Sequence, residues 1–240
     1  MFAKYLLLKK ANKLESKSDK FVTISILTLF PKVFQDIFSS SIIGRAQKRK
    51  LIKISTVNIR DFAYNRHHQV DDKPYGGGIG MIMRVDIIDK ALSSIKLKNK
   101  NSVFKEKIVL LDPKGKQFNQ SKARSYSKLD HLILICGHYE GIDERISHFI
   151  DERISIGKYV LTGGEIPAMV ITDAVVRLIS GVLVKKQATI EESFGTGGYL
   201  EEPQYTRPPV YKGLKVPQVL LSGNHKEISD WRKSKRILLK

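Results

Sequence analysis

The sequence predicts an α/β fold with a mostly parallel sheet and a small helical domain at the carboxyl end. Three short apolar runs, Ile108–Leu111, Leu132–Cys136 and Tyr159–Leu161, each lead into a segment that contains glycine. Buried strands end in this way at the ligand site of an open sheet. Two further runs, Phe21–Leu29 and Leu51–Val57, are predicted strands, and strands that alternate with helices pair in parallel.

Helices are predicted where apolar residues recur at intervals of three and four. They are expected after Pro31, over Asp86–Ile95, from about Gln120 and over Pro167–Ile179. The chain is therefore expected to have four parts: a disordered basic extension (1–20), a cofactor-binding domain (21–182), a linker (183–200) and a small helical domain (201–240). In the last part, Asn224 begins a helix like a capping box.

The composition favours an anionic partner. The 240 residues include 42 Lys+Arg and 24 Asp+Glu, which gives a formal net charge of +18. Such an excess predicts attraction to nucleic acid, although a lysine-rich solvated surface has the same composition. A single cysteine excludes an internal disulfide and fits a reducing cytoplasm. No apolar run is long enough for a membrane span, and the amino-terminal apolar stretch is too short for a secretory signal.

Residues 58–83 have no hydrophobic period, but they combine chemically active side chains. Arg60, Arg66, two histidines and Asp71 precede the run Gly76-Gly77-Gly78. Arginine, histidine and glycine backbone N–H groups bind phosphates. A solvated loop with a glycine hinge accounts for the same residues equally well.

Other candidate residues have two interpretations each. Glu191 and Glu192 in the linker are either solvated or supply a mobile general base. Asp173 and Arg177 share a helix face, as an ion pair or as support for a developing oxyanion. Cys136, two residues before His138, is either a nucleophile or a buried small hydrophobe, and the second interpretation is adopted. The histidine spacing predicts no structural metal.

Five motifs together resemble the bacterial tRNA (guanine-N1)-methyltransferase family. They are RHHQVDDKPYGGGIGM, CGHYEGIDER, SIGKYVLTGGEIPAM, QYTRPPVYKGLKVPQVLLSGNH and the following helix with Trp231-Arg232. The resemblance implies a trefoil-knot (SPOUT) methyltransferase, and strand and helix patterns alone do not predict such a knot. It also implies methyl transfer from S-adenosylmethionine to N1 of guanine 37 in tRNA, next to the anticodon.

The resemblance also implies roles for individual residues. Arg66, His67 and Asp71 match the tRNA-contacting loop, Arg177 matches the arginine beside the guanine, and Glu192 holds the position of the general base. The family is a homodimer with its active site between subunits, depends on magnesium, and contacts tRNA through its carboxyl-terminal domain. Residues in three loops match the cofactor contacts: Leu111, Pro113, Gly137, Glu140, Gly141, Ile156, Gly157, Lys158, Tyr159, Val160, Leu161, Gly163 and Gly164.

Three substitutions depart from the family pattern. Glu192 stands where the family has aspartate, Ile79 replaces a proline, and His138 replaces an arginine. The extra methylene of Glu192 changes the geometry of the base while keeping its chemistry. Two alternatives therefore stand beside the guanine-37 enzyme: a knotted methyltransferase acting on another RNA, and a cofactor- or tRNA-binding homologue with weak turnover.

Overall fold

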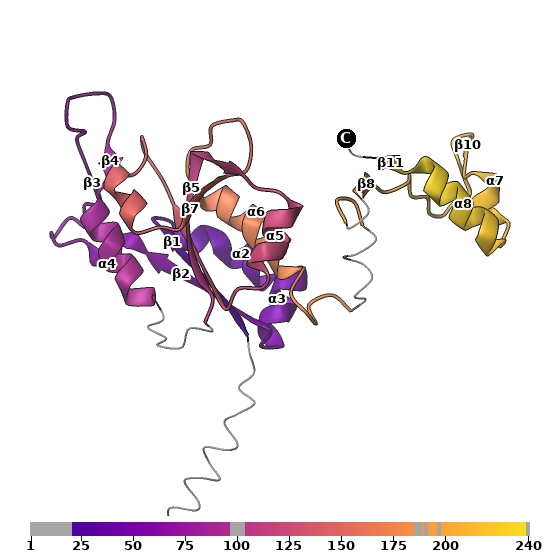
Figure 1. Ribbon diagram of the computed structural model, residues 1–240, viewed down its shortest axis with the longest axis horizontal. Coiled ribbons are helices and arrows are strands. Elements are labelled where there is room, and N and C mark those ends of the chain that lie inside the picture. The colour runs from indigo at the N-terminus through magenta and orange to yellow at the C-terminus, as the bar shows by residue number, and fades with distance from the viewer. Residues whose placement is uncertain (1–20, 97–103, 185–188, 190–191, 196–197, 239–240) are drawn as a thin grey trace, which may run out of the picture. The chain divides into compact units, whose positions relative to one another are not determined.

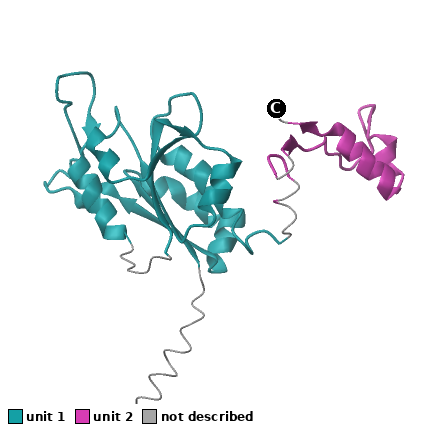
Figure 2. Ribbon diagram, viewed as in Figure 1, with its two compact units in different colours: residues 1–184 teal, residues 185–240 magenta. Residues whose placement is uncertain are grey.

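The computed structural model describes residues 21–96, 104–184, 189, 192–195 and 198–238. The chain forms two compact units, residues 1–184 and 185–240 (Figure 2). The predicted extension over 1–20 and part of the predicted linker lie outside the described residues.

A five-stranded sheet organises the first unit, in the order β2-β1-β6-β5-β7. All neighbouring strands pair in parallel, which confirms the predicted α/β class. The central strand β6 is buried along its whole length, as its unbroken apolar run predicts. The strands are β1 (Val22–Thr28), β2 (Ile52–Asn58), β5 (Glu106–Gln117), β6 (His131–Cys136) and β7 (Glu152–Ser155).

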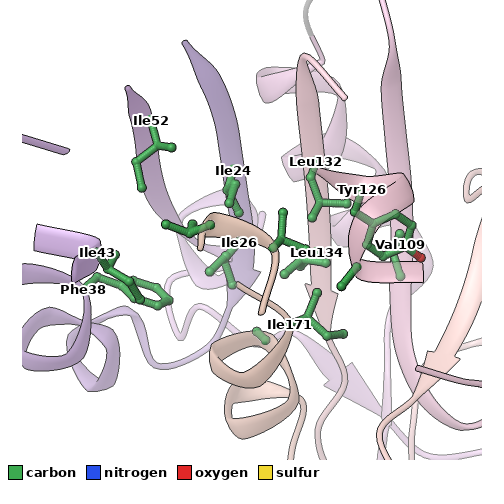
Figure 3. Close-up of a cluster of buried hydrophobic side chains, with 14 of the residues drawn as sticks. Ile24, Ile26, Phe38, Ile43, Ile52, Val109, Tyr126, Leu132, Leu134 and Ile171 are labelled. Atoms are coloured by element: carbon green, nitrogen blue, oxygen red, sulfur yellow. The ribbon is translucent and has the colours of Figure 1, made fainter. Parts of the chain in front are cut away.

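Helices cover both faces of the sheet and enclose two apolar clusters (Figure 1). Because side chains alternate along a strand, Ile26 belongs to one cluster and Leu27 to the other. The first cluster packs Leu134 and Ile171 together with Ile26 (Figure 3). The helices are η1 (Pro31–Phe34), α2 (Gln35–Ser39), α3 (Ser41–Lys48), η2 (Ile59–Phe62), α4 (Val85–Ile95), α5 (Gln120–Tyr126), η3 (Glu144–His148) and α6 (Glu165–Val176).

The prediction of a buried strand over Tyr159–Leu161 is wrong. The strand is β7, which ends at Ser155, and the predicted residues lie in the loop before α6. Tyr159 is 55% exposed and Val160 is 85% exposed. The error has a physical cause, because β7 is a short strand rich in polar residues whose one buried member is Ile154.

The prediction that a loop begins after Leu111 also needs correction. β5 continues through Asp112-Pro113-Lys114-Gly115 to Gln117, with an irregularity in its pairing to β7. Leu111 and Lys116 both lie opposite Ile154, so the intervening residues form a bulge. A Cβ on Gly115 would lie 2.6 Å from the Cα of Ile154, so only glycine fits at this close approach.

A buried chain of polar side chains joins β1, β6 and β5. His131 is 1% exposed, its Nε2 lies 2.8 Å from the Ser25 hydroxyl, and its Nδ1 lies 2.7 Å from the Glu106 carboxylate. Because the carboxylate only accepts hydrogen bonds, Nδ1–H donates to Glu106, and Nε2 of the neutral ring accepts from Ser25. Burial lowers the pKa of His131, and the Glu106 carboxylate offsets only part of this effect.

We expect the His131 pKa to make the free energy of unfolding depend on pH. The unfolded chain protonates this histidine near pH 6.5, whereas the folded protein resists protonation until a lower pH. The stabilisation is therefore complete above about pH 6.5 and declines as the pH falls toward the folded pKa. Urea unfolding at pH 7.5 and 5.5 should show a larger loss for the wild type than for His131→Gln, which cannot titrate there. Equal losses in the two proteins would contradict this expectation.

The described part of the second unit contains two short helices and two small antiparallel pairs of strands. Asn224 caps the longer helix by accepting hydrogen bonds from the backbone N–H groups of Lys226 and Glu227, which confirms the predicted helix start. No helix in the described parts of either unit has the length and apolar character to cross a membrane. The elements are β8 (Tyr199–Leu200), β9 (Val210–Tyr211), β10 (Leu214–Lys215), α7 (Gln218–Leu221), α8 (His225–Lys235) and β11 (Ile237–Leu238).

Candidate functional site

A cavity of about 300 Å³ lies at the carboxyl ends of β6 and β7, beside the bulge in β5. Three segments line it, within 110–114, 137–144 and 154–164, and Pro167 of α6 completes the wall. Open parallel sheets bind their ligands at this edge, because the connecting loops meet there.

The structure brings the residues predicted for the cofactor together around this cavity, with Lys158 as the exception. The cavity also includes Tyr139, Thr162 and Pro167, which the motif comparison omitted. Each of the three lies within three residues of a predicted contact, so their positions in the sequence could have identified them as part of the cavity.

Glycine is required where two loops meet beside the cavity. The Gly164 N–H donates to the Gly137 carbonyl over 2.8 Å. A Cβ on Gly164 would lie 2.6 Å from the Cα of Cys136 and 2.9 Å from the nitrogen of Gly137. Backbone therefore forms this wall, and no side chain fits between the loops.

The side chains of the cavity provide apolar surface rather than a nucleophile. Leu110, Ile154 and Leu161 line it. Cys136 is fully buried behind the wall, which confirms its interpretation as a small hydrophobe. Burial raises the pKa of the Cys136 thiol and the charge of Glu165 adds to the rise, so the thiolate needed for attack is suppressed.

Glu144 lines the cavity, and its carboxylate is already paired with neighbouring side chains. Arg153 donates to it over 2.6 Å and Ser147 over 2.8 Å. The Arg153 hydrogen bond lowers the pKa of Glu144, and the Ser147 hydrogen bond lowers it further. A carboxylate stabilised in its ionised form is a weak proton acceptor, so Glu144 is poorly suited to be a general base.

His138 is the substituted residue of the cofactor motif, and its ring is held by other rings. It packs edge-on against Phe30 at 5.1 Å and against Tyr139 at 4.9 Å between centroids. Its Nδ1 is buried without a hydrogen-bond partner among the described residues. The imidazole therefore packs as an aromatic ring in the wall of the cavity, whereas an arginine at this position could make two charged hydrogen bonds.

The predicted tRNA loop protrudes from the sheet as a hairpin. β3 (Asp71–Asp72) pairs with β4 (Ile82–Met83), and the tip between them contains four glycines with positive φ (Figure 1). Tyr75 is 100% exposed and Ile79 is 94% exposed at this tip. Arg66 and His67 are also exposed, and Asp71 is half-buried at the base of the hairpin.

Backbone hydrogen bonds join the base of this hairpin to the cofactor loop. The Glu140 N–H donates to Met81, the Met83 N–H donates to Gly141, and the Asp143 N–H donates to Met83, over 2.9 to 3.1 Å. A Cβ on Gly80 would meet the Glu140 carboxylate, with Oε1 at 2.7 Å. The residues predicted for tRNA and for the cofactor thus share one hydrogen-bonded framework.

The two residues predicted for catalysis belong to different units. Arg177 follows the last residue of α6 in the first unit, is half-buried, and donates its backbone N–H to Asp173 over 3.2 Å. Glu192 lies in the second unit, where its carbonyl accepts from the Gly195 N–H over 2.8 Å. The next residue, Ser193, exchanges hydrogen bonds with Glu201. Local contacts therefore shape the segment that carries Glu192.

The described residues contain no group of three or more histidine, cysteine or acidic side chains arranged to hold a metal ion.

Comparison with known proteins gives consistent matches over most of the chain. A family described as tRNA (Guanine-1)-methyltransferase TrmD matches residues 22–239. A protein of Carboxydothermus hydrogenoformans named tRNA (guanine-N(1)-)-methyltransferase is 56% identical over 216 residues, which cover 90% of this chain and 83% of that protein. Proteins of the same name from Clostridium botulinum (strain Hall) and Latilactobacillus sakei are each 50% identical. They cover 90% and 87% of this chain, and 87% and 83% of their own lengths.

Proposed function

The chain belongs to the tRNA (guanine-1)-methyltransferase family, and on that premise we propose that it methylates N1 of guanine in tRNA. We propose further that the target is guanine 37, next to the anticodon. The observation that carries the proposal is the cavity at the carboxyl ends of β6 and β7, beside the bulge in β5, which the residues matched to the cofactor motifs line together.

The cavity suits S-adenosylmethionine, which when bound would supply an electrophilic methyl group. The apolar side chains of Leu110, Ile154 and Leu161 suit an adenine ring, and backbone groups of the glycine loops suit its polar edge. The close approaches of Gly115 to Ile154 and of Gly164 to Cys136 support loops that pass tightly by one another. A deep trefoil knot stays a prediction of the family resemblance.

Guanine N1 carries a proton and is a poor nucleophile until that proton is removed. We assign the removal to the Glu192 carboxylate and the stabilisation of charge on guanine O6 to the Arg177 guanidinium. The hydrogen bonds that join Glu140, Gly141 and Met83 would hold the predicted tRNA loop and the cofactor loop in a fixed relative position. Such positioning of reactants supplies a large part of an enzyme's rate enhancement.

An exposed apolar surface supports a homodimer with the active site between subunits. Phe30, Val33 and Ile37 on and beside η1 and α2 are 42%, 49% and 46% exposed. Ile166 and Val170 on α6 are 54% and 44% exposed, and α6 contacts η1. Exposed apolar surface of this kind favours a self-complementary interface. A monomer in sedimentation at micromolar concentration would contradict it.

Two further partners follow from the family. The excess of lysine and arginine suits tRNA, and the exposed Arg66 and His67 suit its phosphates. Magnesium dependence is expected from the family alone, and a loss of rate on addition of EDTA tests it.

Methyl transfer to defined tRNA transcripts tests the proposed function. Purified protein, S-adenosylmethionine and transcripts with G or A at position 37 are incubated, and 1-methylguanosine is measured by mass spectrometry. We expect product from the G37 transcript alone. Equal methylation of both transcripts would exclude guanine 37 as the target. Tight S-adenosylhomocysteine binding without turnover would favour the binding homologue, which the glutamate at position 192 makes worth testing.

A further inference from the structure

Arg60 bridges the two loops on which the proposed function depends. It lies in η2 and is half-buried. One terminal nitrogen of its guanidinium lies 3.3 Å from the hydroxyl of Tyr139, which lines the cofactor cavity. The other lies 3.5 Å from the carbonyl oxygen of His68, directly after Arg66 and His67. Arg60 thus joins two residues that are far apart in sequence. Tyr139 lines the proposed cofactor cavity, and His68 follows the residues proposed to contact tRNA.

The link between Arg60 and His68 runs in both directions. The His68 ring Nδ1 lies 3.1 Å from the backbone carbonyl of Arg60, and since a carbonyl only accepts, Nδ1–H is the donor. The guanidinium contacts are long for hydrogen bonds and are individually weak. His68 is nevertheless held at two points, because the guanidinium contacts its carbonyl oxygen and the backbone carbonyl of Arg60 contacts its ring.

Both partners of Arg60 have an uncommon backbone conformation. His68 has φ 50° and Tyr139 has φ 58°, in the left-handed region that residues with a Cβ rarely adopt. The His68 N–H donates to Asn65, and the Gln69 N–H donates to the Asn65 side chain, so a tight turn closes around His68. Such conformations persist where surrounding contacts hold them, and they cluster at functional sites.

We propose that Arg60 is a positioning residue for the methyl-transfer reaction. Through Tyr139 it holds the segment Arg66–His68 in the conformation that accepts tRNA, while the cofactor loop serves as the fixed point. This inference rests on the proposed function. The planar guanidinium reaches Tyr139 and His68 with separate nitrogens, whereas lysine has a single nitrogen for both partners.

The Arg60→Lys variant keeps the positive charge but removes the guanidinium, so it separates the positioning role from a general effect of charge. We expect the KM for tRNA to rise about tenfold, the effect of losing two weak hydrogen bonds together, with kcat within about twofold of wild type. Binding of S-adenosylhomocysteine should change by less than about twofold. Arg49→Lys is the matched control, because Arg49 is exposed at the carboxyl end of α3, just before the amino end of β2, and the substitution is chemically identical. We expect Arg49→Lys to leave all three values unchanged.

A double-mutant cycle with Tyr139→Phe tests the path of the effect. If the tyrosine hydroxyl acts through Arg60, Tyr139→Phe raises the KM for tRNA in the wild type and adds little in the Arg60→Lys background. Additive effects on KM would show that Tyr139 and Arg60 act separately, and would overturn the bridge.

Amide hydrogen exchange provides a readout that does not require tRNA. We expect faster exchange over residues 65–70 in Arg60→Lys than in the wild type, with the strands of the sheet unchanged. Faster exchange with an unchanged KM for tRNA would overturn the positioning role. An unchanged exchange rate would show that Arg60 does not hold this segment. If the wild type methylates no tRNA, the proposed function fails, and the exchange result still decides whether Arg60 fixes the loop.

Discussion

Replacing Glu192 with glutamine is expected to lower kcat for methyl transfer about 10²–10⁴-fold, the range over which a general base contributes. Glutamine keeps the size of the side chain but cannot take the proton from guanine N1. S-adenosylhomocysteine affinity should be unchanged, because Glu192 is not among the residues that line the cofactor cavity. Single-turnover methylation of a G37 transcript measures the effect on the chemical step.

Two companion variants make the Glu192 result specific. Glu191→Gln removes the neighbouring charge of the same segment and is expected to keep the wild-type rate. Glu192→Asp restores the residue found in the family and is expected to match or exceed the wild-type rate. A wild-type rate for Glu192→Gln would exclude Glu192 as the base, and a loss of rate in Glu191→Gln alone would move the assignment to its neighbour.

Substituting Gly164 with alanine should destabilise the first unit by about 1–3 kcal/mol, the cost of inserting a methyl group where there is no space. The backbone of Gly164 has φ −81°, which alanine adopts without strain. At such a position a change to alanine would otherwise stabilise the fold by about 0.4–1 kcal/mol, through the unfolded state. The sign of the change therefore reports the clash with Cys136 and Gly137. Urea unfolding measures it.

Gly137→Ala is the matched control for the Gly164 variant. The two glycines are hydrogen-bonded neighbours, yet a Cβ on Gly137 has its nearest contact at 3.5 Å, an ordinary van der Waals distance. We expect Gly137→Ala to unfold at nearly the wild-type urea concentration, while its S-adenosylhomocysteine affinity falls because a methyl group would narrow the cavity. Equal destabilisation by both substitutions would show that the close approach at Gly164 has no special role.

The sequence predicts the regular elements well where the apolar pattern is strong. β1, β2, β6 and α4 lie within a few residues of their predicted bounds. β7 was missed because its packing depends on one isoleucine among polar residues, and no period of two is visible in Glu152–Ser155. The sequence Asp-Pro-Lys-Gly is typical of a loop after a strand, so it does not predict that β5 continues through a bulge.

The site was less accessible than the fold to reasoning from residues alone. Glycine at strand ends predicted a pocket built of backbone, but the ligand and the individual contacts came from the family resemblance. Arg60 was visible only as one member of an irregular segment, because its contact with Tyr139 spans 79 positions along the chain. Contacts of that separation depend on tertiary packing, which local spacing does not encode.

The two units should respond differently to salt. Among the described residues of the second unit, the buried one is a charged residue, Glu202. Its carboxylate lies 3.2 Å from the guanidinium of Arg236 and 3.7 Å from that of Arg232. Burial alone would raise the pKa of Glu202, but the hydrogen bond from its own backbone N–H and the two arginines lower it overall. The Arg232 side chain is 54% exposed, so mobile ions screen its contact with Glu202, whereas the apolar clusters around the sheet do not depend on charge. The ionic strength would then change the fraction of molecules in which the second unit, which carries Glu192, is folded.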